Sequence, residues 1–207
     1  MTSGPFVRPY ATTDRADLAD ICVRTGHEGG DSRSLHPDLD LLPAIFALPY
    51  VEREPQLAFV VEADGRAVGY VIGTADTQAF VRWYRTTWLP TLAERWPAPT
   101  SAPATAGEEM VHLMHTPERL LLPELAAHPA HLHIDLLPGF QRRGLGRALM
   151  RRFLAALAEQ GVPAVHLGMV TANTAARAFY DRTGFQPLAV PDPGPLTYLG
   201  RPTTGEV

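Results

Sequence analysis

The chain has 207 residues, of which 45% are hydrophobic, so it can bury a sizeable core, and a single domain over residues 1–207 is the expected organisation. A formal net charge of −4 argues against a nucleic-acid partner. No run approaches the roughly 18 apolar residues of a membrane span, and the N-terminus lacks a basic-then-apolar signal pattern, which predicts a cytoplasmic protein with no membrane partner.

The first predicted elements are a strand over residues 6–10 and a helix that starts near Thr13. Thr13 or Asp14 would cap this helix, because their side-chain oxygens can accept from the free amides of a first turn. The glycine-rich stretch 27–31 would end it. The single cysteine, Cys22, has no partner for an internal disulfide, and its place on the apolar stripe of this helix predicts packing rather than nucleophilic chemistry.

A second helical region is predicted over residues 38–48, with Pro37 and Pro49 as its limits. The strongest hairpin pattern of the chain follows, with β-rich runs at 57–62 and 67–74 joined by an Asp-Gly turn. Because these antiparallel strands precede a strand, helix, strand unit, we expect a mixed sheet.

An aromatic-rich segment then interrupts the strands, and residues 78–128 are expected to form a helical insertion after the third strand. Trp83, Tyr84 and Trp88 either wall a substrate cleft or pack the insertion onto the sheet. In chain order, the expected elements are a helix to Trp88, a break at Pro90 before the helix resumes to Arg95, a loop over 97–107, and two helices over 108–115 and 122–127.

The rest of the chain is organised around a predicted strand at residues 131–136. Apolar and polar side chains alternate there, as in a strand with one face of each kind: Leu132, Ile134 and Leu136 against His131, His133 and Asp135. Pro138 would end the strand, and a helix with apolar residues at helical spacing starts near Gly144. The polar face also has the residue types of a metal site, but three ligands on one strand are a weak pattern.

The start of that helix is predicted to bind a pyrophosphate. A first helical turn has unpaired amides and the positive end of the helix dipole, and glycines there let an anion approach. A dinucleotide-binding Gly-x-Gly-x-x-Gly motif would need glycine in place of Leu149, and a Walker loop would need a lysine, which the chain lacks. The expected contacts are Gln141, Arg142, Arg143, Gly144, Leu145, Gly146 and Arg147.

The C-terminal part is predicted to complete the sheet. A buried strand over 164–170 is followed by a helix that Asn173 caps and that ends before Gly184. Two final strands are expected over 185–190 and 196–201.

The pattern Gln-x-x-Gly-x-Gly after a strand ending in Leu-Leu-Pro, followed by the Asn, Phe-Tyr and Gly-Phe elements of segment 173–185, resembles the GNAT superfamily of acyl-CoA-dependent N-acetyltransferases. A further resemblance, which would cover residues from about 57 to 201, is to the C-terminal acetyltransferase-like domain of O-GlcNAcase and its stand-alone bacterial relatives. It lies in residues 68–76, Trp88-Leu-Pro, His115, Leu-Pro-Glu at 122–124 and Ile-Asp135. The animal domain of that group is described as a pseudo-acetyltransferase whose phosphate loop lacks the glycine pattern, which is intact here.

The resemblance implies an α/β (α+β) GNAT fold: a mixed, mostly antiparallel sheet of about seven strands with helices on both faces. It implies acetyl-CoA as the cofactor, with the diphosphate on residues 141–147. The pantetheine arm would bond to the backbone of Leu136 and Leu137, in a gap between the two central strands. Asn173 and Tyr180 match family positions that touch the cofactor near its thioester sulfur.

Two residues are candidates for proton transfer. Tyr180 would protonate the leaving thiolate, because a phenol has a reference pKa of about 10 and a thiol one of about 8.5. Asp135 would accept the proton of the amine or bind a substrate cation. The alternatives are that Tyr180 is a core aromatic, that Asn173 is only a helix cap, and that Asp135 orients loop amides.

These observations favour an N-acetyltransferase in which an amine attacks the thioester directly in a ternary complex, since the setting of Cys22 argues against an acyl-enzyme. Asp135, Trp83 and Trp88 are the predicted substrate contacts. A catalytically silent acyl-CoA-binding module is the main alternative, and a metal-dependent enzyme ranks last. The amine, a small molecule or a peptide, and the oligomeric state, monomer or homodimer, stay open at this point.

Overall fold

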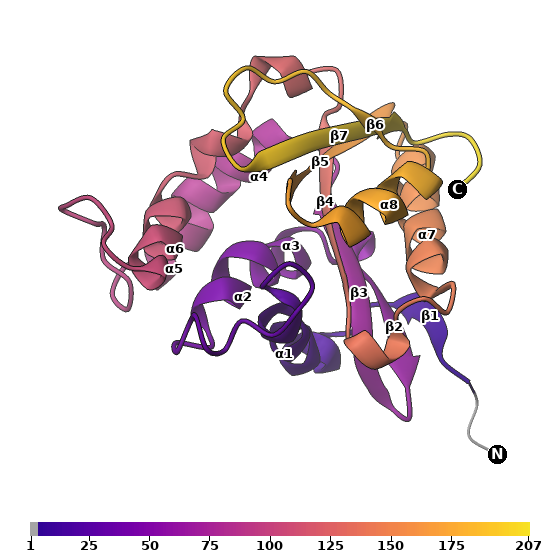
Figure 1. Cartoon of the computed structure of the whole chain (residues 1–207), viewed down its shortest axis with the longest axis horizontal. Helices are drawn as coiled ribbons and strands as arrows, with labels where there is room; N and C mark the ends of the chain where they lie inside the picture. Colours follow the sequence, from indigo (N-terminus) through magenta and orange to yellow (C-terminus); the bar gives the residue numbers. More distant parts are fainter. Residues whose placement is uncertain (1–3) are drawn as a thin grey trace.

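The computed structural model describes residues 4–207 and shows a seven-stranded sheet with helices on both faces (Figure 1). The strands are β1 (Phe6–Pro9), β2 (Phe59–Ala63), β3 (Arg66–Thr74), β4 (Ala130–Leu136), β5 (Ala164–Val170), β6 (Gln186–Pro187) and β7 (Leu196–Pro202). The helices are α1 (Arg15–Thr25), α2 (Leu41–Phe46), α3 (Leu48–Arg53), α4 (Thr77–Trp83), α5 (Leu89–Leu92), α6 (Ala106–His115), α7 (Leu145–Glu159) and α8 (Thr174–Arg182). Short turns of 3-10 or π type are η1 (Thr12–Asp14), η2 (Pro55–Leu57), η3 (Tyr84–Trp88), η4 (Pro117–Leu120), η5 (Pro123–Leu125) and η6 (Pro138–Phe140).

The sheet order is β1-β2-β3-β4-β5-β7-β6. Every neighbouring pair is antiparallel except β4 and β5. This parallel pair is joined at Ala130–Val165 and His131–His166, near the start of both strands. Toward their carboxyl ends the two strands separate, which opens a gap in the middle of the sheet. The architecture confirms the predicted mixed, mostly antiparallel GNAT fold.

Two hydrophobic clusters lie on the two faces of the sheet. Helix α7 covers one face, where its buried Phe153 packs among side chains of β2, β4 and β5. Helices α1 to α3 and the segment between β3 and β4 cover the other face, around the buried Tyr70 of β3. The β-carbon of a larger residue at Gly73 would collide with the Phe153 ring and the His131 carbonyl, so β3 needs glycine there.

The hairpin, the central strand and the helix after it form where the periodicity predicts them, but three local predictions are wrong. Pro49 and Pro90 lie in the first turns of α3 and α5 instead of ending or breaking helices. For Pro49 the reason is that the first turn of a helix needs no amide donor at this position. Pro90 instead directly follows the π-type turn η3, within a helical run that is unbroken from Thr77 to Leu92. The expected helix over 122–127 is only the short turn η5.

The predicted side-chain cap of the first helix is also wrong. Asp14 lies at the N-cap position of α1 but makes no cap hydrogen bond. Its carboxylate instead accepts from the Ala11 amide at 2.8 Å and from both terminal nitrogens of Arg8 at 2.7 Å. It therefore ties β1 to the start of the helix.

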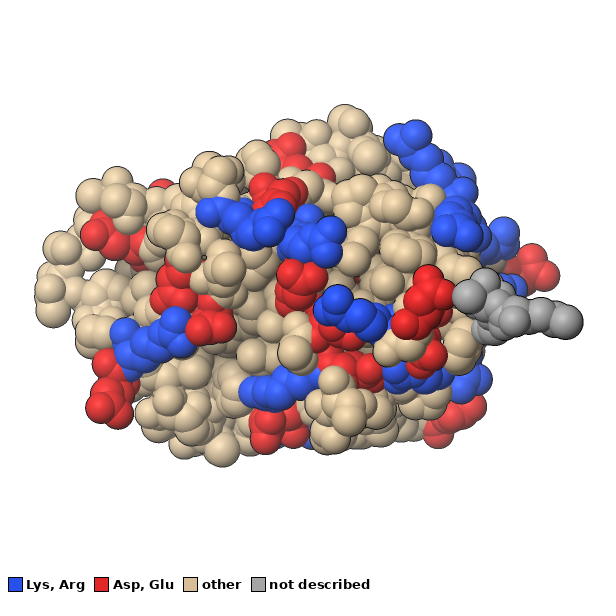
Figure 2. Space-filling model, turned by 90° about the horizontal axis from the view of Figure 1, so that it is seen from below, with Lys and Arg blue, Asp and Glu red and all other residues tan. Residues whose placement is uncertain are grey.

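Within residues 4–207, none of the helices combines the length and the apolar composition that crossing a bilayer requires. On the face shown in Figure 2, basic and acidic side chains of the described residues lie interspersed rather than in a broad patch of one sign. Surface arginines commonly have carboxylate partners. Arg95, for example, bonds to Asp38 and Asp40 at 2.8 and 2.7 Å.

Candidate active site

The gap between β4 and β5 belongs to a large cavity of about 1400 Å³. At one end it is lined by the N-terminal half of α8 and, from the predicted loop, by Gln141, Arg142, Gly144, Gly146 and Arg147, but not by Arg143 or Leu145. It follows the carboxyl-terminal halves of β4 and β5 and continues toward α3, η3 and η4. The predicted phosphate loop and the polar face of β4 therefore open onto the same space.

The loop before α7 presents a run of unpaired amides. Helix α7 begins after Gly144, which has no side-chain cap. The Gln141 amide donates to the Pro138 carbonyl at 3.3 Å, and the Ala148 amide donates to the Gly144 carbonyl at 3.0 Å. Between these two, none of the amides from 142 to 147 donates to a backbone carbonyl of the described residues. Six consecutive free donors at the positive end of a helix dipole have the arrangement with which helix N-termini bind anions.

The two glycines of the loop are needed for different reasons. Gly144 has φ of +80°, a left-handed conformation that costs other residues about 1–2 kcal/mol, and the space around it is open. A β-carbon at Gly146 would lie 3.2 Å from the Phe179 ring of α8. Glycine at position 146 therefore lets α8 pack close to the start of α7.

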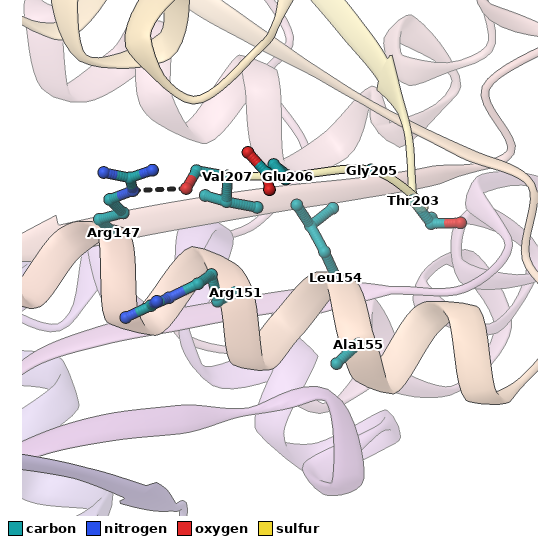
Figure 3. Close-up of a pocket in the computed structure, with 8 residues that line it drawn as sticks. All are labelled: Arg147, Arg151, Leu154, Ala155, Thr203, Gly205, Glu206 and Val207. Carbon is teal, nitrogen blue, oxygen red and sulfur yellow. Dashed lines mark hydrogen bonds between the residues drawn. The ribbon is translucent and has the colours of Figure 1, made fainter.

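Arg142, Arg143 and Arg147 of this loop make no salt bridge in the part of the chain that the structure describes. Arg143 lies over the Phe140 ring at 5.8 Å from its centroid. The Nε atom of Arg147 donates to the Val207 carbonyl, beside a separate pocket of about 480 Å³ between α7 and residues 203–207 (Figure 3). The side chain of Gln141 turns back to the strand before the loop, where its Nε2 donates to the Leu136 carbonyl at 2.9 Å.

The hydrogen-bond register of β4 decides which backbone groups face the gap. The Leu137 amide donates to the Val68 carbonyl at 3.0 Å, so residues 137 and 135 direct their backbone groups toward β3. Ile134 and Leu136 then direct theirs toward β5, from which β4 has separated. Leu137 is engaged on both sides, because its carbonyl accepts from the Phe140 amide. The backbone groups that line the gap are therefore those of Ile134 and Leu136 rather than of the predicted pair Leu136 and Leu137.

Asp135 and Tyr180 are electrostatically coupled, because the Asp135 carboxylate disfavours loss of the Tyr180 phenol proton. The Tyr70 hydroxyl donates to Asp135 Oδ2 at 2.7 Å. Burial raises the pKa of Asp135, and this hydrogen bond offsets part of that rise. Burial also raises the pKa of Tyr180, and the charge of Asp135 raises it further. Both side chains line the cavity, with Asp135 on β4 and Tyr180 on α8.

Asn173 serves as the N-cap of α8. Its Oδ1 accepts from the Ala176 amide at 2.9 Å, and the residue also lines the cavity. Its amide nitrogen makes no hydrogen bond with the described residues, so it can donate into the cavity while the oxygen caps the helix.

The structure does not bring the two predicted tryptophans to the cavity. Trp88 is buried, with its Nε1 donating to the Ala44 carbonyl at 2.9 Å, and Trp83 stacks on it at a centroid distance of 6.1 Å. Neither lines the cavity, whereas Phe80 and Tyr84 of the same segment do. The tryptophans therefore pack the segment between β3 and β4, and its other two aromatic residues form the wall.

A chain of hydrogen bonds links the histidines of β4 to Tyr50 of α3. The Thr77 hydroxyl donates to the Pro129 carbonyl at 2.7 Å, so at 2.8 Å it can only accept from His131 Nδ1. Burial holds the pKa of His131 well below its ordinary value, and its Nε2 then accepts from the Tyr50 hydroxyl at 2.8 Å. The Tyr50 oxygen in turn accepts from His133 Nε2 at 3.1 Å.

This chain determines the protonation of His133, which sequence reasoning considered only as a metal ligand. Burial lowers the pKa of His133 to about 4, and the ring is neutral with its proton on Nε2. Among the described residues, no group of three or more His, Cys, Asp or Glu side chains is placed to hold a metal ion. Tyr50 was missed because its partners come from β4, 81 and 83 residues further along the chain.

Cys22 is 5% exposed on α1, near Tyr70 and Asp135. Burial raises the pKa of its thiol, which keeps it protonated. A buried, protonated thiol is a poor nucleophile.

Comparisons with known proteins agree with this fold. The model of the acetyltransferase (GNAT) family matches residues 107–185. The crystal structure of SsHAT is 60% identical, with a TM-score of 0.95, and the match covers 98% of this chain and 100% of that chain. The structure of yncA from Salmonella typhimurium with its cofactor acetyl-CoA is 16% identical, with a TM-score of 0.56 over 98% of this chain and 95% of that one, and shows the same fold.

Protein O-GlcNAcase of Rattus norvegicus is 23% identical over 199 residues, which are 94% of this chain and 22% of that protein. The chain thus spans about 22% of the length of the curated relatives that it matches first. The chain belongs to the acetyltransferase (GNAT) family.

Proposed function

We propose that the protein is an acetyl-CoA-dependent N-acetyltransferase in which an amine attacks the thioester directly in a ternary complex. The observation that carries the proposal is the continuity of the cavity, which joins the free amides of residues 142–147 to Asp135 and Tyr180. A structural neighbour of the same fold, yncA, is described with acetyl-CoA.

The residues present fit this cofactor. The amides of residues 142–147, with the guanidinium groups of Arg142 and Arg143, would hold the diphosphate. The backbone of Ile134 and the amide of Leu136, whose carbonyl accepts from Gln141, face the gap and would bond to the pantetheine arm. Asn173 would donate through its free amide nitrogen. When bound, acetyl-CoA supplies an acetyl group activated as a thioester.

The proton transfers follow from Asp135 and Tyr180. As the amine nitrogen bonds to the acetyl carbon and the carbon–sulfur bond breaks, one proton must leave the nitrogen and one must reach the sulfur. Asp135 accepts the first, because its raised pKa makes it a stronger base than an exposed aspartate. Tyr180 donates the second, because its raised pKa keeps the phenol protonated until the thiolate forms.

The test is thiol release from acetyl-CoA with a panel of amines. Asp135→Asn should lower kcat about 10²- to 10⁴-fold, the usual contribution of a general base, and Tyr180→Phe should also lower it. The rate of the unmodified protein should rise with pH through the raised pKa of Asp135, and this rise should be lost in Asp135→Asn. Tyr10→Phe, outside the cavity, is the matched control and should leave kcat unchanged.

Two results would contradict the proposal. Unchanged turnover in both variants would remove Asp135 and Tyr180 from the mechanism. Binding of acetyl-CoA with no turnover across the panel would instead favour a catalytically silent acyl-CoA-binding module.

A further inference from the structure

Arg119, on η4, is a cation in the cavity wall without a carboxylate partner. It is partly buried, and its side chain makes no ion pair or hydrogen bond with residues 4–207. Its neighbours in the same segment differ, since Arg85 bonds to Glu118 and Arg95 to Asp38 and Asp40. Burial lowers the pKa of Arg119, as expected when a charge loses water and gains no counter-charge. An uncompensated charge of this kind is unfavourable unless a ligand pairs with it.

Tyr84 places a second unpaired donor in the same part of the cavity. Its side chain is 3% exposed, and its hydroxyl is buried with no hydrogen-bond partner. The charge of Arg119 lowers the pKa of Tyr84 against the rise that burial causes, so the two groups are neighbours. Tyr84 begins the π-type turn η3, a geometry that is often found at functional sites.

Arg119 and Asp135 influence different groups of the cavity, whose lining also has Arg142, Arg147 and Arg182. The charge of Arg119 lowers the pKa values of three tyrosines, Tyr50, Tyr84 and Tyr198, and of the two histidines of β4. The charge of Asp135 raises the pKa values of different groups, namely Cys22, Tyr70 and Tyr180. The other carboxylate of the lining, Glu28, is exposed at the end of α1. A strand rises about 3.3 Å per residue, so the positions of His133 and His131 lie roughly 7 and 13 Å from that of Asp135.

We propose that the acceptor amine also has a carboxylate group, which Arg119 and Tyr84 bind while the amine lies at Asp135. The inference rests on the proposed function and specifies its substrate class. A carboxylate matches one guanidinium and one hydroxyl in charge and in hydrogen bonds, whereas a phosphate dianion would leave one charge unpaired. The surrounding wall is apolar, with Phe80, Met110 and Leu120, and suits a hydrocarbon spacer.

The separation of Asp135 from Arg119 and Tyr84 limits the length of the acceptor. One amino-acid residue spans at most about 3.6 Å, which is too short to join Asp135 to the neighbourhood of His133. Amino acids with a terminal side-chain amine, ω-amino carboxylic acids and dipeptides are long enough. An α-amine with its own carboxylate is not.

The experiment compares 6-aminohexanoate with hexylamine, which has the same amine and chain length but no carboxylate. The unmodified protein should acetylate 6-aminohexanoate with at least tenfold higher kcat/KM. Arg119→Met should raise the KM for 6-aminohexanoate, so that the kcat/KM values of the two acceptors differ by no more than about twofold. The KM for acetyl-CoA should be unchanged. Tyr84→Phe should have a smaller effect in the same direction. Arg151→Met, an exposed arginine on α7, is the matched control and should keep the preference.

Equal use of the two amines by the unmodified protein would overturn the inference, as would a preference that persists in Arg119→Met. A binding measurement separates this failure from that of the proposed function. Hexanoate has no amine to acetylate, yet calorimetry in the presence of coenzyme A should detect its binding, and Arg119→Met should abolish it. If no amine is turned over but hexanoate binds through Arg119, the enzyme assignment fails and the anion site stands. If hexanoate gives no heat, the anion site fails.

Discussion

Two buried tyrosines that differ in their hydroxyl partners provide a direct test of the hydrogen-bond assignment. Tyr50 is 2% exposed, and its hydroxyl bridges His131 and His133, whereas Tyr84 is 3% exposed and its hydroxyl has no partner. Replacement by phenylalanine removes one oxygen from each without a large change of shape. The two substitutions should therefore have different effects on stability.

The magnitudes follow from what each substitution leaves behind. Tyr50→Phe leaves Nε2 of the buried His131 without a donor, which costs about 1–3 kcal/mol, and also removes the bond to His133. In a protein of this size each 1 kcal/mol shifts the Tm by roughly 2–4 °C, so we expect a decrease of about 2–12 °C. Tyr84→Phe removes a hydroxyl that is already unpaired and should be neutral or slightly stabilising.

Urea unfolding and thermal melts of the two variants, without ligand, are the assays. The reasoning would be refuted if the two losses were equal, or if Tyr84→Phe were the more destabilising. Either result would mean that the Tyr84 hydroxyl has a hydrogen-bond partner, or that the series of hydrogen bonds linking Thr77, His131, Tyr50 and His133 does not form.

Two further predictions concern pH and charge. Burial depresses the pKa of His131 and His133 in the folded state. Their contribution to the free energy of unfolding is therefore complete above about pH 6.5 and is lost as the pH falls. Urea titrations should show the unfolding free energy falling by up to about 1.4 kcal/mol per pH unit for each histidine as the pH decreases from 6 to 4.5. Asp135 partly offsets this fall, because its raised pKa makes the folded state more stable as the pH decreases. An unfolding free energy that does not change with pH would contradict the prediction. Asp14→Asn should cost about 1–3 kcal/mol at pH 7, because its carboxylate holds a bidentate arginine and a backbone amide, and an unchanged midpoint in urea would show that these bonds contribute nothing.

The elements predicted best from the sequence are those determined by local periodicity. β5 forms over Ala164–Val170 as expected, and α7 and α8 begin at the positions that the glycine and asparagine patterns indicate. Each signal lies within one element and needs no knowledge of distant neighbours. The error at Pro49 has a local cause too, because a proline inside the first turn of a helix has the same sequence pattern as one that ends the preceding helix.

The walls of the cavity could not be predicted in the same way. A π-type turn over Tyr84–Trp88 changes the helical phase, so a period of 3.6 residues does not show which aromatic side chain faces the sheet. The absence of a counter-charge at Arg119 depends on where segments far apart in the chain fold. The role of Leu137 depends on its register with Val68 of β3, which only the paired strands reveal.

The account depends most directly on an anion binding to the free amides between 142 and 147, and one pair of variants tests it. Gly144 lies just before α7 and Gly161 just after it, with φ of +80° and +73° and open space around each, so substitution by glutamate causes a similar backbone strain at both. Calorimetry should detect acetyl-CoA binding to the unmodified protein and to Gly161→Glu. It should show binding at least tenfold weaker in Gly144→Glu, where the new carboxylate lies beside the amides. Equal affinities in the two variants, or no heat with the unmodified protein, would contradict the assignment.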